Sequence, residues 1–416
     1  MKARFTSKTK LQGLRRVCHV SLLTLILAPA TLPVAATEVI DSRTLPLPLP
    51  QQQDYSAQPA LSQRVQRPRI QLAILLDTSN SMDGLIDQTR NQLWQVVNEF
   101  ATAKQDGVAP ILEIALFEYG NSGNARDSGY VRQLNGFTRE LDAVSQGLYS
   151  LSTSGGDEYC GYAIEQAIHT LQWSQSATDI KTIFIAGNES FAQGPVRYQD
   201  AVQMARQYGI SINTIHAGSH TAGVEDGWQA GAILAGGDYL SIDADQQVVH
   251  IEAPQDARIN ELNAQLNKTY VPYGSQGAGK AQRQIQQDQM SGEISTGLLA
   301  KRAQSKASAF YGNADWDLVD ALKDGEVAEE QIAEMEDTAL PEPMQGLSAQ
   351  QKLDYLQQKQ VERESIRDEI LELSESRSSY VAEKKKEQTA AAPGVSDALT
   401  GAIRKQAEQK NFTFDN

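Results

Sequence analysis

Residues 69–81 read Arg-Ile-Gln-Leu-Ala-Ile-Leu-Leu-Asp-Thr-Ser-Asn-Ser. The apolar run from Ile70 to Leu76 is short and nearly continuous, which is typical of a strand buried on both faces of a parallel sheet. The run ends at Asp77, and short polar residues follow it. This stretch therefore predicts a central strand with a polar loop at its carboxyl end.

Strand-like and helix-like segments alternate from this stretch to residue 242. The expected strands are 70–76, 111–117, 130–137 (at an edge), 180–185, 210–216 and 239–242. The expected helices are 85–103, 139–151, 164–171, 198–208 and 228–234. This alternation predicts an α/β fold, a doubly wound and mostly parallel sheet with helices on both faces. Such sheets bind ligands in the loops at the carboxyl ends of their strands.

The composition changes after residue 270, where Ala, Gln, Glu, Lys and Ser dominate. The glycine-rich stretch 274–279 predicts a break, and the fragment 277–280 predicts a linker rather than a phosphate loop. Helices are expected at 283–308, 347–388 and 397–409. The apolar residues of the long charged stretch only partly hold a heptad register. It is typical of a helical hairpin or coiled coil, or of a solvated helical tail without a partner.

The N-terminus predicts export. Residues 1–36 combine a basic start, an apolar stretch and a small-residue cleavage site, the pattern of a secretory signal peptide. The alternative is an uncleaved membrane anchor, but the apolar run is shorter than the roughly 20 residues that span a bilayer. We expect a periplasmic or secreted protein. Its expected parts are a signal peptide at 1–36, a Pro/Gln-rich linker at 37–68, a sheet-and-helix domain at 69–270 and a helical, partly coiled-coil-like region at 271–416.

Composition excludes several classes of function. The chain has 37 Lys and Arg against 52 Asp and Glu, a formal net charge of −15. This argues against nucleic-acid and anionic-membrane binding, which need basic surface. No segment after the signal peptide is apolar enough to span a membrane. The 2 cysteines exclude a disulfide framework and a thiolate zinc site. Cys160 is expected to pack as a small apolar residue, the alternative being a reactive thiol.

The loop after the first strand has the spacing of a cation site. Asp77, Ser79 and Ser81 lie at positions i, i+2 and i+4, so in extended backbone their oxygens share one side. A carboxylate and two hydroxyls suit a hard cation such as Mg²⁺, with Mn²⁺ or Ca²⁺ as alternatives. The helix that follows adds the positive end of its dipole, which favours an anionic ligand group beside the metal. Without this context, the same pattern is typical of a strand-end turn with an N-capping serine.

In this context the sequence resembles the von Willebrand factor type A (VWA) family and its metal-ion-dependent adhesion site (MIDAS). The resemblance covers about residues 69–245. In that family the first loop carries D-x-S-x-S, the second loop adds a Thr after a Gly pair, and the third loop adds an Asp after a core strand. The resemblance therefore implies that Asp77, Ser79 and Ser81 are metal ligands.

Both later loops depart from the family pattern. In the second loop, residues 153–161, Asp157 follows the Gly pair, takes the Thr place and offers a charged oxygen. In the third loop Gly187 stands in the Asp place, and the second-choice ligands are Asn188 and Glu189. Glu158 is a further second choice. These loops resemble the Gly-Gly-Asp-Glu and Ala-Gly-Asn-Glu loops of exported bacterial members of the family, which indicates a subfamily pattern.

The resemblance implies a binding module rather than an enzyme. One divalent cation would leave a coordination position open for an acidic group on a protein partner, and the C-terminal helices would position the module or self-associate. One alternative is a metal-free scaffold that acts through its helical C-terminal region. The other is a metal-dependent hydrolase with Glu158 or Glu189 as general base. Metal titration separates the three.

Other residues give weaker evidence for a functional site. His216 and His220 lie four residues apart, but Gly218 and the end of a strand between them argue against a zinc-binding helix. Four aromatic side chains near the predicted loop ends either rim a binding face or pack in the core: Tyr119, Tyr159, Phe191 and Trp228.

Overall fold

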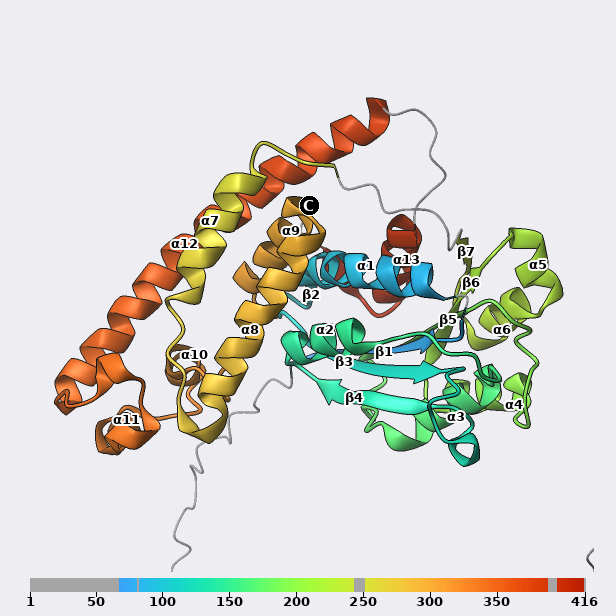
Figure 1. The fold of residues 1–416 in the computed structure, drawn as a ribbon, viewed down its shortest axis with the longest axis horizontal. Helices are drawn as coiled ribbons and strands as arrows, with labels where there is room; N and C mark the ends of the chain where they lie inside the picture. Colours follow the sequence, from blue (N-terminus) through green and yellow to red (C-terminus); the bar gives the residue numbers. More distant parts are fainter. Residues whose placement is uncertain (1–66, 81, 243–250, 388–394, 415–416) are drawn as a thin grey trace, which may run out of the picture. The chain divides into compact units, whose positions relative to one another are not determined.

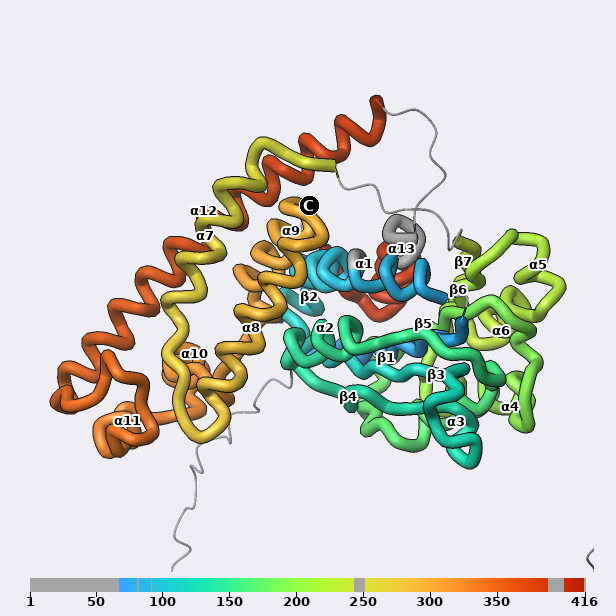
Figure 2. Tube along the Cα trace, in the orientation of Figure 1, coloured from blue at the N-terminus to red at the C-terminus, as the bar shows by residue number. Residues whose placement is uncertain are grey.

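The computed structural model describes residues 67–80, 82–242, 251–387 and 395–414 (Figures 1 and 2). The predicted signal peptide, most of the predicted linker and Ser81 lie outside these residues. All described residues belong to one compact unit. Within them, no helix combines the length and the apolar character that a bilayer crossing requires.

A six-stranded sheet with the order β4-β3-β1-β5-β6-β7 forms the centre of the fold. Its strands are β1 (Arg69–Asp77), β3 (Ile111–Tyr119), β4 (Arg132–Thr138), β5 (Ile180–Gly187), β6 (Ser211–Ala217) and β7 (Tyr239–Ile242). All neighbouring strands are parallel except β3 and β4. The predicted mostly parallel sheet is confirmed, with β4 at one edge.

Successive side chains of β1 point to opposite faces of the sheet, and helices cover both. Leu72 and Leu76 belong to one apolar cluster, and Ala73 and Leu75 belong to another. The first cluster includes α1 (Asp83–Ala101) and α2 (Leu141–Ser150), and the second includes α3 (Cys160–Thr170), α4 (Tyr198–Gln207) and α6 (Trp228–Ala235). The expectation of helices on both faces is confirmed, and the short α5 (His220–Glu225) was not expected.

The end of the chain completes the first face of the sheet. Helix α13 (Val395–Glu408) packs against α1, and its Ile403 joins the apolar cluster of α1 and α2. Beyond it, β8 (Phe412–Phe414) pairs antiparallel with β2 (Ala103–Gln105). Figure 1 shows α13 next to α1 although about 300 residues separate them along the chain. The final helix is thus part of the sheet domain by its contacts.

The segment between β7 and α13 is largely helical, as predicted after residue 270, and the helix at residues 256–267 was not expected. Its helices are α7 (Asp256–Asn267), α8 (Gly274–Ile294), α9 (Thr296–Ala307), α10 (Leu318–Lys323), α11 (Glu329–Glu334) and α12 (Ala349–Glu387). Short 3₁₀ helices lie in the same segment at Asp337–Ala339 and Glu342–Met344, and another lies between β3 and β4 at Arg126–Ser128. Helix α12 packs against α7, α9, α10 and α11, so the alternative of a solvated tail is wrong. Because α7 lies against α9 and α12, its contacts are with the helical segment. The division at residue 270 and the coiled coil stay predictions.

The predicted break at 274–279 is wrong, because these residues form the first turns of α8. A Cβ atom at Gly277 would lie 3.1 Å from the carbonyl carbon of Pro272 and 3.3 Å from the carbonyl oxygen of Trp316. A glycine here lets the start of the helix lie against neighbouring backbone, which no local pattern announces. The actual interruption is Ser295, whose hydroxyl accepts a hydrogen bond from the Leu298 amide at 3.0 Å and caps α9.

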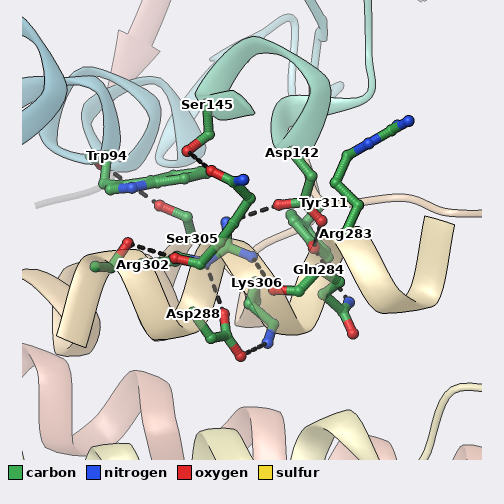
Figure 3. A network of polar contacts seen from close by, with 12 residues as sticks. Trp94, Asp142, Ser145, Arg283, Gln284, Asp288, Arg302, Ser305, Lys306 and Tyr311 are labelled. Carbon is green, nitrogen blue, oxygen red and sulfur yellow. Dashed lines mark hydrogen bonds and ion pairs between the residues drawn. The ribbon is translucent and has the colours of Figure 1, made fainter. Parts of the chain in front are cut away.

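A buried polar network joins α9 to α2 and α8 (Figure 3). The guanidinium of Arg302 donates to Asp142 Oδ1 at 2.7 Å and to Asp288 Oδ1 at 2.6 Å, and it lies 4.7 Å from the ring centroid of Trp94. Lys306 Nζ lies 2.9 Å from Asp288 Oδ2. Burial acts to raise the pKa of Asp288, but the charges of Lys306 and Arg302 outweigh it and hold that pKa well below its usual range. Each buried charge in the network therefore has an opposite charge beside it.

Replacing Arg302 with Ala is expected to lower the free energy of unfolding by about 3–5 kcal/mol, because Asp142 and Asp288 lose their main cationic partner. The matched control is Arg258→Ala, whose side chain is 44% exposed and pairs with exposed carboxylates. That loss should stay below about 1 kcal/mol. Urea unfolding measures both, and equal losses would contradict the network's role.

The docking of α13 gives a second expectation. Ile403 is 2% exposed and packs on the sheet, so Ile403→Ala should lower the free energy of unfolding by about 2–5 kcal/mol through lost apolar contact and the cavity left behind. Glu408→Ala, at an exposed position of the same helix, should change it little. Urea unfolding is again the measurement. An unchanged midpoint for Ile403→Ala would contradict the packing of α13 on the sheet.

Candidate functional site

The carboxyl edge of the sheet, where β1, β3 and β5 end, gathers several loops. Backbone hydrogen bonds join the loop after β1, the loop after β3 and the loop between α2 and α3. The Thr78 amide donates to the Tyr119 carbonyl at 2.9 Å, and the Ser154 amide donates to the Thr78 carbonyl at 3.0 Å. The Ser122 amide donates to the Ser154 carbonyl at 3.3 Å. The first and second predicted metal loops are therefore held side by side, as a single site requires.

Asp77 lies at the centre of this edge and is completely buried. Its Oδ1 accepts a hydrogen bond from the Ser79 amide at 2.8 Å, which tightens the turn after β1. Among the described residues, neither Asp77 Oδ2 nor the buried hydroxyl of Ser79 has a hydrogen-bond partner. Buried polar atoms are nearly always paired, because an unpaired one costs about 1–3 kcal/mol. Two oxygens of the predicted ligand set are thus buried and available.

The structure brings Glu158 to Asp77. The side chain of Glu158 is buried, and a Cβ atom at Gly120 would lie 2.7 Å from Asp77 Oδ1 and 2.9 Å from Glu158 Cγ. Burial, followed by the Asp77 carboxyl, raises the pKa of Glu158 to about 9. Burial also raises the pKa of Asp77. Two carboxyl groups this close and this poorly solvated retain a proton at neutral pH unless a cation replaces it.

Asp157, the ligand predicted from the Gly pair, has a different environment. Its side chain is exposed, and its Oδ2 accepts a hydrogen bond from the Tyr159 hydroxyl at 2.9 Å. The neighbouring Glu158 points inward, and its amide donates to Gln193 Oε1 at 2.6 Å. Successive side chains of an extended loop point to opposite sides, so a difference of one residue decides which carboxylate reaches the site. Ligation by either one stays a prediction.

The third loop contributes backbone rather than a carboxylate. Gly187 has no room for a side chain, since a Cβ atom there would collide with the Tyr119 hydroxyl and lie 3.1 Å from Asp77 Oδ2. That hydroxyl donates to the Ala186 carbonyl at 2.8 Å. The backbone of Asn188 acts to lower the pKa of the Asp77 carboxyl, against the larger opposite effect of burial, whereas the side chain of Glu189 is exposed. Tyr119 thus occupies the space that a third-loop Asp would need, a role that sequence reasoning missed.

The aromatic residues near the loops are mostly core. Tyr119, Phe191 and Trp228 are fully buried, and only Tyr159 is partly exposed. The Trp228 indole donates a hydrogen bond to the Glu189 carbonyl at 2.8 Å, which helps to hold the third loop in place. The possibility that these four side chains rim a binding face is therefore wrong for three of them.

Cys160 and His216 also support the loops. Cys160 is buried with its Sγ 3.7 Å from the Tyr119 hydroxyl, and burial raises the pKa of the thiol well above its usual range. It packs as predicted, rather than as a reactive thiol. His216 is buried, and its Nε2 lies 3.3 Å from the Asn188 carbonyl oxygen, beside the third loop rather than on a metal-binding helix.

The candidate ligand atoms of Asp77, Ser79 and Glu158 are oxygens, which fits a hard divalent cation. In the described part of the chain, no group of three or more His, Cys, Asp or Glu side chains is placed to hold a metal ion. A cation would therefore rely on Asp77 and Glu158 together with hydroxyl groups. Ser79 supplies one hydroxyl, and the other predicted donor, Ser81, lies outside the described residues.

Residues 71–224 match the family model of the von Willebrand factor type A domain. This part of the chain is a VWA domain. VWA domains are generally protein-binding adhesion modules and are typically not catalytic. The match runs from β1 into α5, so the helical segment from α7 to α12 lies outside it. The finer expectation of an exported bacterial subfamily stays a prediction.

Several solved structures are similar to this chain at low identity. BatB from Bacteroides thetaiotaomicron is 14% identical, with a TM-score of 0.32, over 42% of this chain and 90% of that one. The SpRpn10 VWA domain is 16% identical, with a TM-score of 0.30, over 44% and 100%. Proximal thread matrix protein 1 from the mussel byssus, with a zinc-occupied MIDAS motif, is 11% identical, with a TM-score of 0.29, over 43% of each chain. No curated protein matches the sequence.

The Glu158 carboxyl gives a pH dependence that can be measured without metal. Its pKa is raised from 4.5 to about 9, so between these values the folded chain holds a proton that the unfolded chain has released. The free energy of unfolding therefore falls as pH rises through this window. In chelator, urea unfolding from pH 5 to 8.5 should show this fall in the wild type, and Glu158→Gln should reduce it. Glu225→Gln, an exposed control on α5, should retain the wild-type slope. Equal slopes in all three chains would contradict a buried, protonated Glu158.

Proposed function

We propose that the VWA domain binds one divalent cation at the carboxyl edge of its sheet and uses it to hold a protein partner. The observation that carries this proposal is the pair of buried, unpartnered oxygens, Asp77 Oδ2 and Ser79 Oγ, at the position implied by the MIDAS resemblance. The proposed ion is Mg²⁺, with Mn²⁺ and Ca²⁺ as alternatives. Its proposed ligands are Asp77, Ser79 and Ser81, with Glu158 in the role first expected for Asp157.

A bound cation would offset the cost of burying two acidic groups at this edge of the sheet. Without it, Asp77 and Glu158 bury two acidic groups that can ionise together only at high cost. When bound, the ion supplies positive charge that stabilises both carboxylates and offers a coordination position to a ligand from outside. The backbone of Asn188 acts to lower the pKa of Asp77, and the charge of Glu189 acts to raise that of Glu158.

The rest of the chain suggests how the module is used. The signal-peptide pattern of residues 1–36 supports export to the periplasm or the exterior. The helical segment from α7 to α12 is joined to the VWA domain through Arg302, so it would orient the module rather than move freely. Self-association through these helices is part of the proposal.

Calorimetric titration with Mn²⁺ or Mg²⁺ tests the proposal directly. The wild type should bind one ion and release protons, because Glu158 must ionise. Asp77→Ala should abolish binding, and Glu158→Gln should weaken it by about tenfold or more through loss of a carboxylate ligand. Asp157→Asn removes the same charge from the adjacent exposed position, where solvent and salt screen it. It should therefore change the affinity for the ion by less than about threefold.

Each other result selects an alternative. If Asp157→Asn loses the ion and Glu158→Gln keeps it, the assignment from the Gly pair is right. No binding by the wild type would favour the metal-free scaffold. Metal-dependent hydrolysis of generic phosphoester or peptide substrates would favour the hydrolase.

A further inference from the structure

We propose that the open coordination position of this cation takes an uncharged oxygen, such as a peptide carbonyl or side-chain amide, and excludes carboxylates. The resemblance to the VWA family implies the opposite, an acidic group on the partner. The inference rests on the proposed function, because it concerns the ligand of the bound ion. It depends on where the chain places its own carboxylates.

Two carboxylates would lie at the proposed ion. Asp77 and Glu158 approach each other across Gly120, where both contact the space of its missing side chain, and both are buried. A divalent cation between two ionised carboxylates has no net charge. In a poorly solvated site, a third carboxylate would bring an uncompensated negative charge, whereas a carbonyl oxygen would bring none.

Hydrogen bonds and packing hold both residues at this edge. The amide of Glu158 is hydrogen bonded to Gln193 Oε1 at 2.6 Å, and its side chain lies against Gly120. Asp77 ends the central strand and is hydrogen bonded to the Ser79 amide. On the third-loop side, the Tyr119 hydroxyl fills the space beside Gly187. The negative charge at the ion is therefore built into the packing of the loops.

The exposed residues around the site are also mostly acidic. Asp157 precedes Glu158 and is exposed, and Glu189 is exposed and close enough for its charge to act on the Glu158 carboxyl. Asp83, at the start of α1, is exposed and accepts a hydrogen bond from the Thr153 hydroxyl at 2.9 Å. Arg126, near Tyr159, is a basic group that offsets part of this charge. A partner with a neutral oxygen flanked by Lys or Arg fits this surface, and an acidic peptide does not.

The test uses the full chain loaded with Mn²⁺, with acetate and N-methylacetamide as probes of the open position. Water-proton relaxation reports the loss of a metal-bound water, and electron paramagnetic resonance reports the change in ligands. Wild type should bind N-methylacetamide and show no binding of acetate. Glu158→Gln leaves the site with one net positive charge and should gain acetate affinity by about tenfold or more. Asp157→Asn makes the same change of charge at the exposed neighbour and should gain less than about threefold.

The outcomes separate this inference from the proposed function. The relaxation titration first shows whether Mn²⁺ binds at all. If it does not bind, both the proposed function and this inference are wrong. If Mn²⁺ binds and acetate binds the wild type as well as it binds Glu158→Gln, only the exclusion of carboxylates is wrong. An equal gain in Asp157→Asn, or no gain in Glu158→Gln, would overturn the assignment of this exclusion to the Glu158 carboxylate.

Discussion

Two carboxyl groups are buried side by side at the end of the central strand, and the surrounding loops are arranged to allow it. Gly120 gives the space between Asp77 and Glu158, and its φ of +76° is one that glycine adopts without strain. Gly187 leaves room for the Tyr119 hydroxyl on the other side. Burying such a pair is costly when both groups are ionised, which supports the proposed cation site.

The rigidity of this edge comes from the layers beneath it. The two faces of β1 pack into separate apolar clusters, so its end is fixed from both sides. One of these clusters includes α13 from the far end of the chain and extends into α7, α9 and α12. Through Arg302, the helical segment is held by the same helix α2 that leads to the second loop. A binding site on such a scaffold needs little reorganisation when a ligand arrives.

The candidate site was predictable only where it is local. Asp77 and Ser79 follow from their spacing after an apolar strand. The choice between Asp157 and Glu158 could not be predicted from the sequence, because the direction of a loop side chain depends on the backbone around it. Tyr119 had one indirect signal: a glycine in the place of an expected ligand means that another side chain fills the space. Its identity required the structure, since 68 positions separate it from Gly187.

The amino-acid sequence alone was enough to predict the alternation of strands and helices, the mostly parallel sheet and the polar loop after β1. These follow from hydrophobic periodicity, which acts between residues close along the chain. Folding in three dimensions brought α13 back to the sheet, made the glycines of 274–279 helical and paired Arg302 with Asp142, 160 positions away. Such features depend on which distant surfaces meet, and a buried charge or a missing side chain has meaning only beside the partner that the fold supplies.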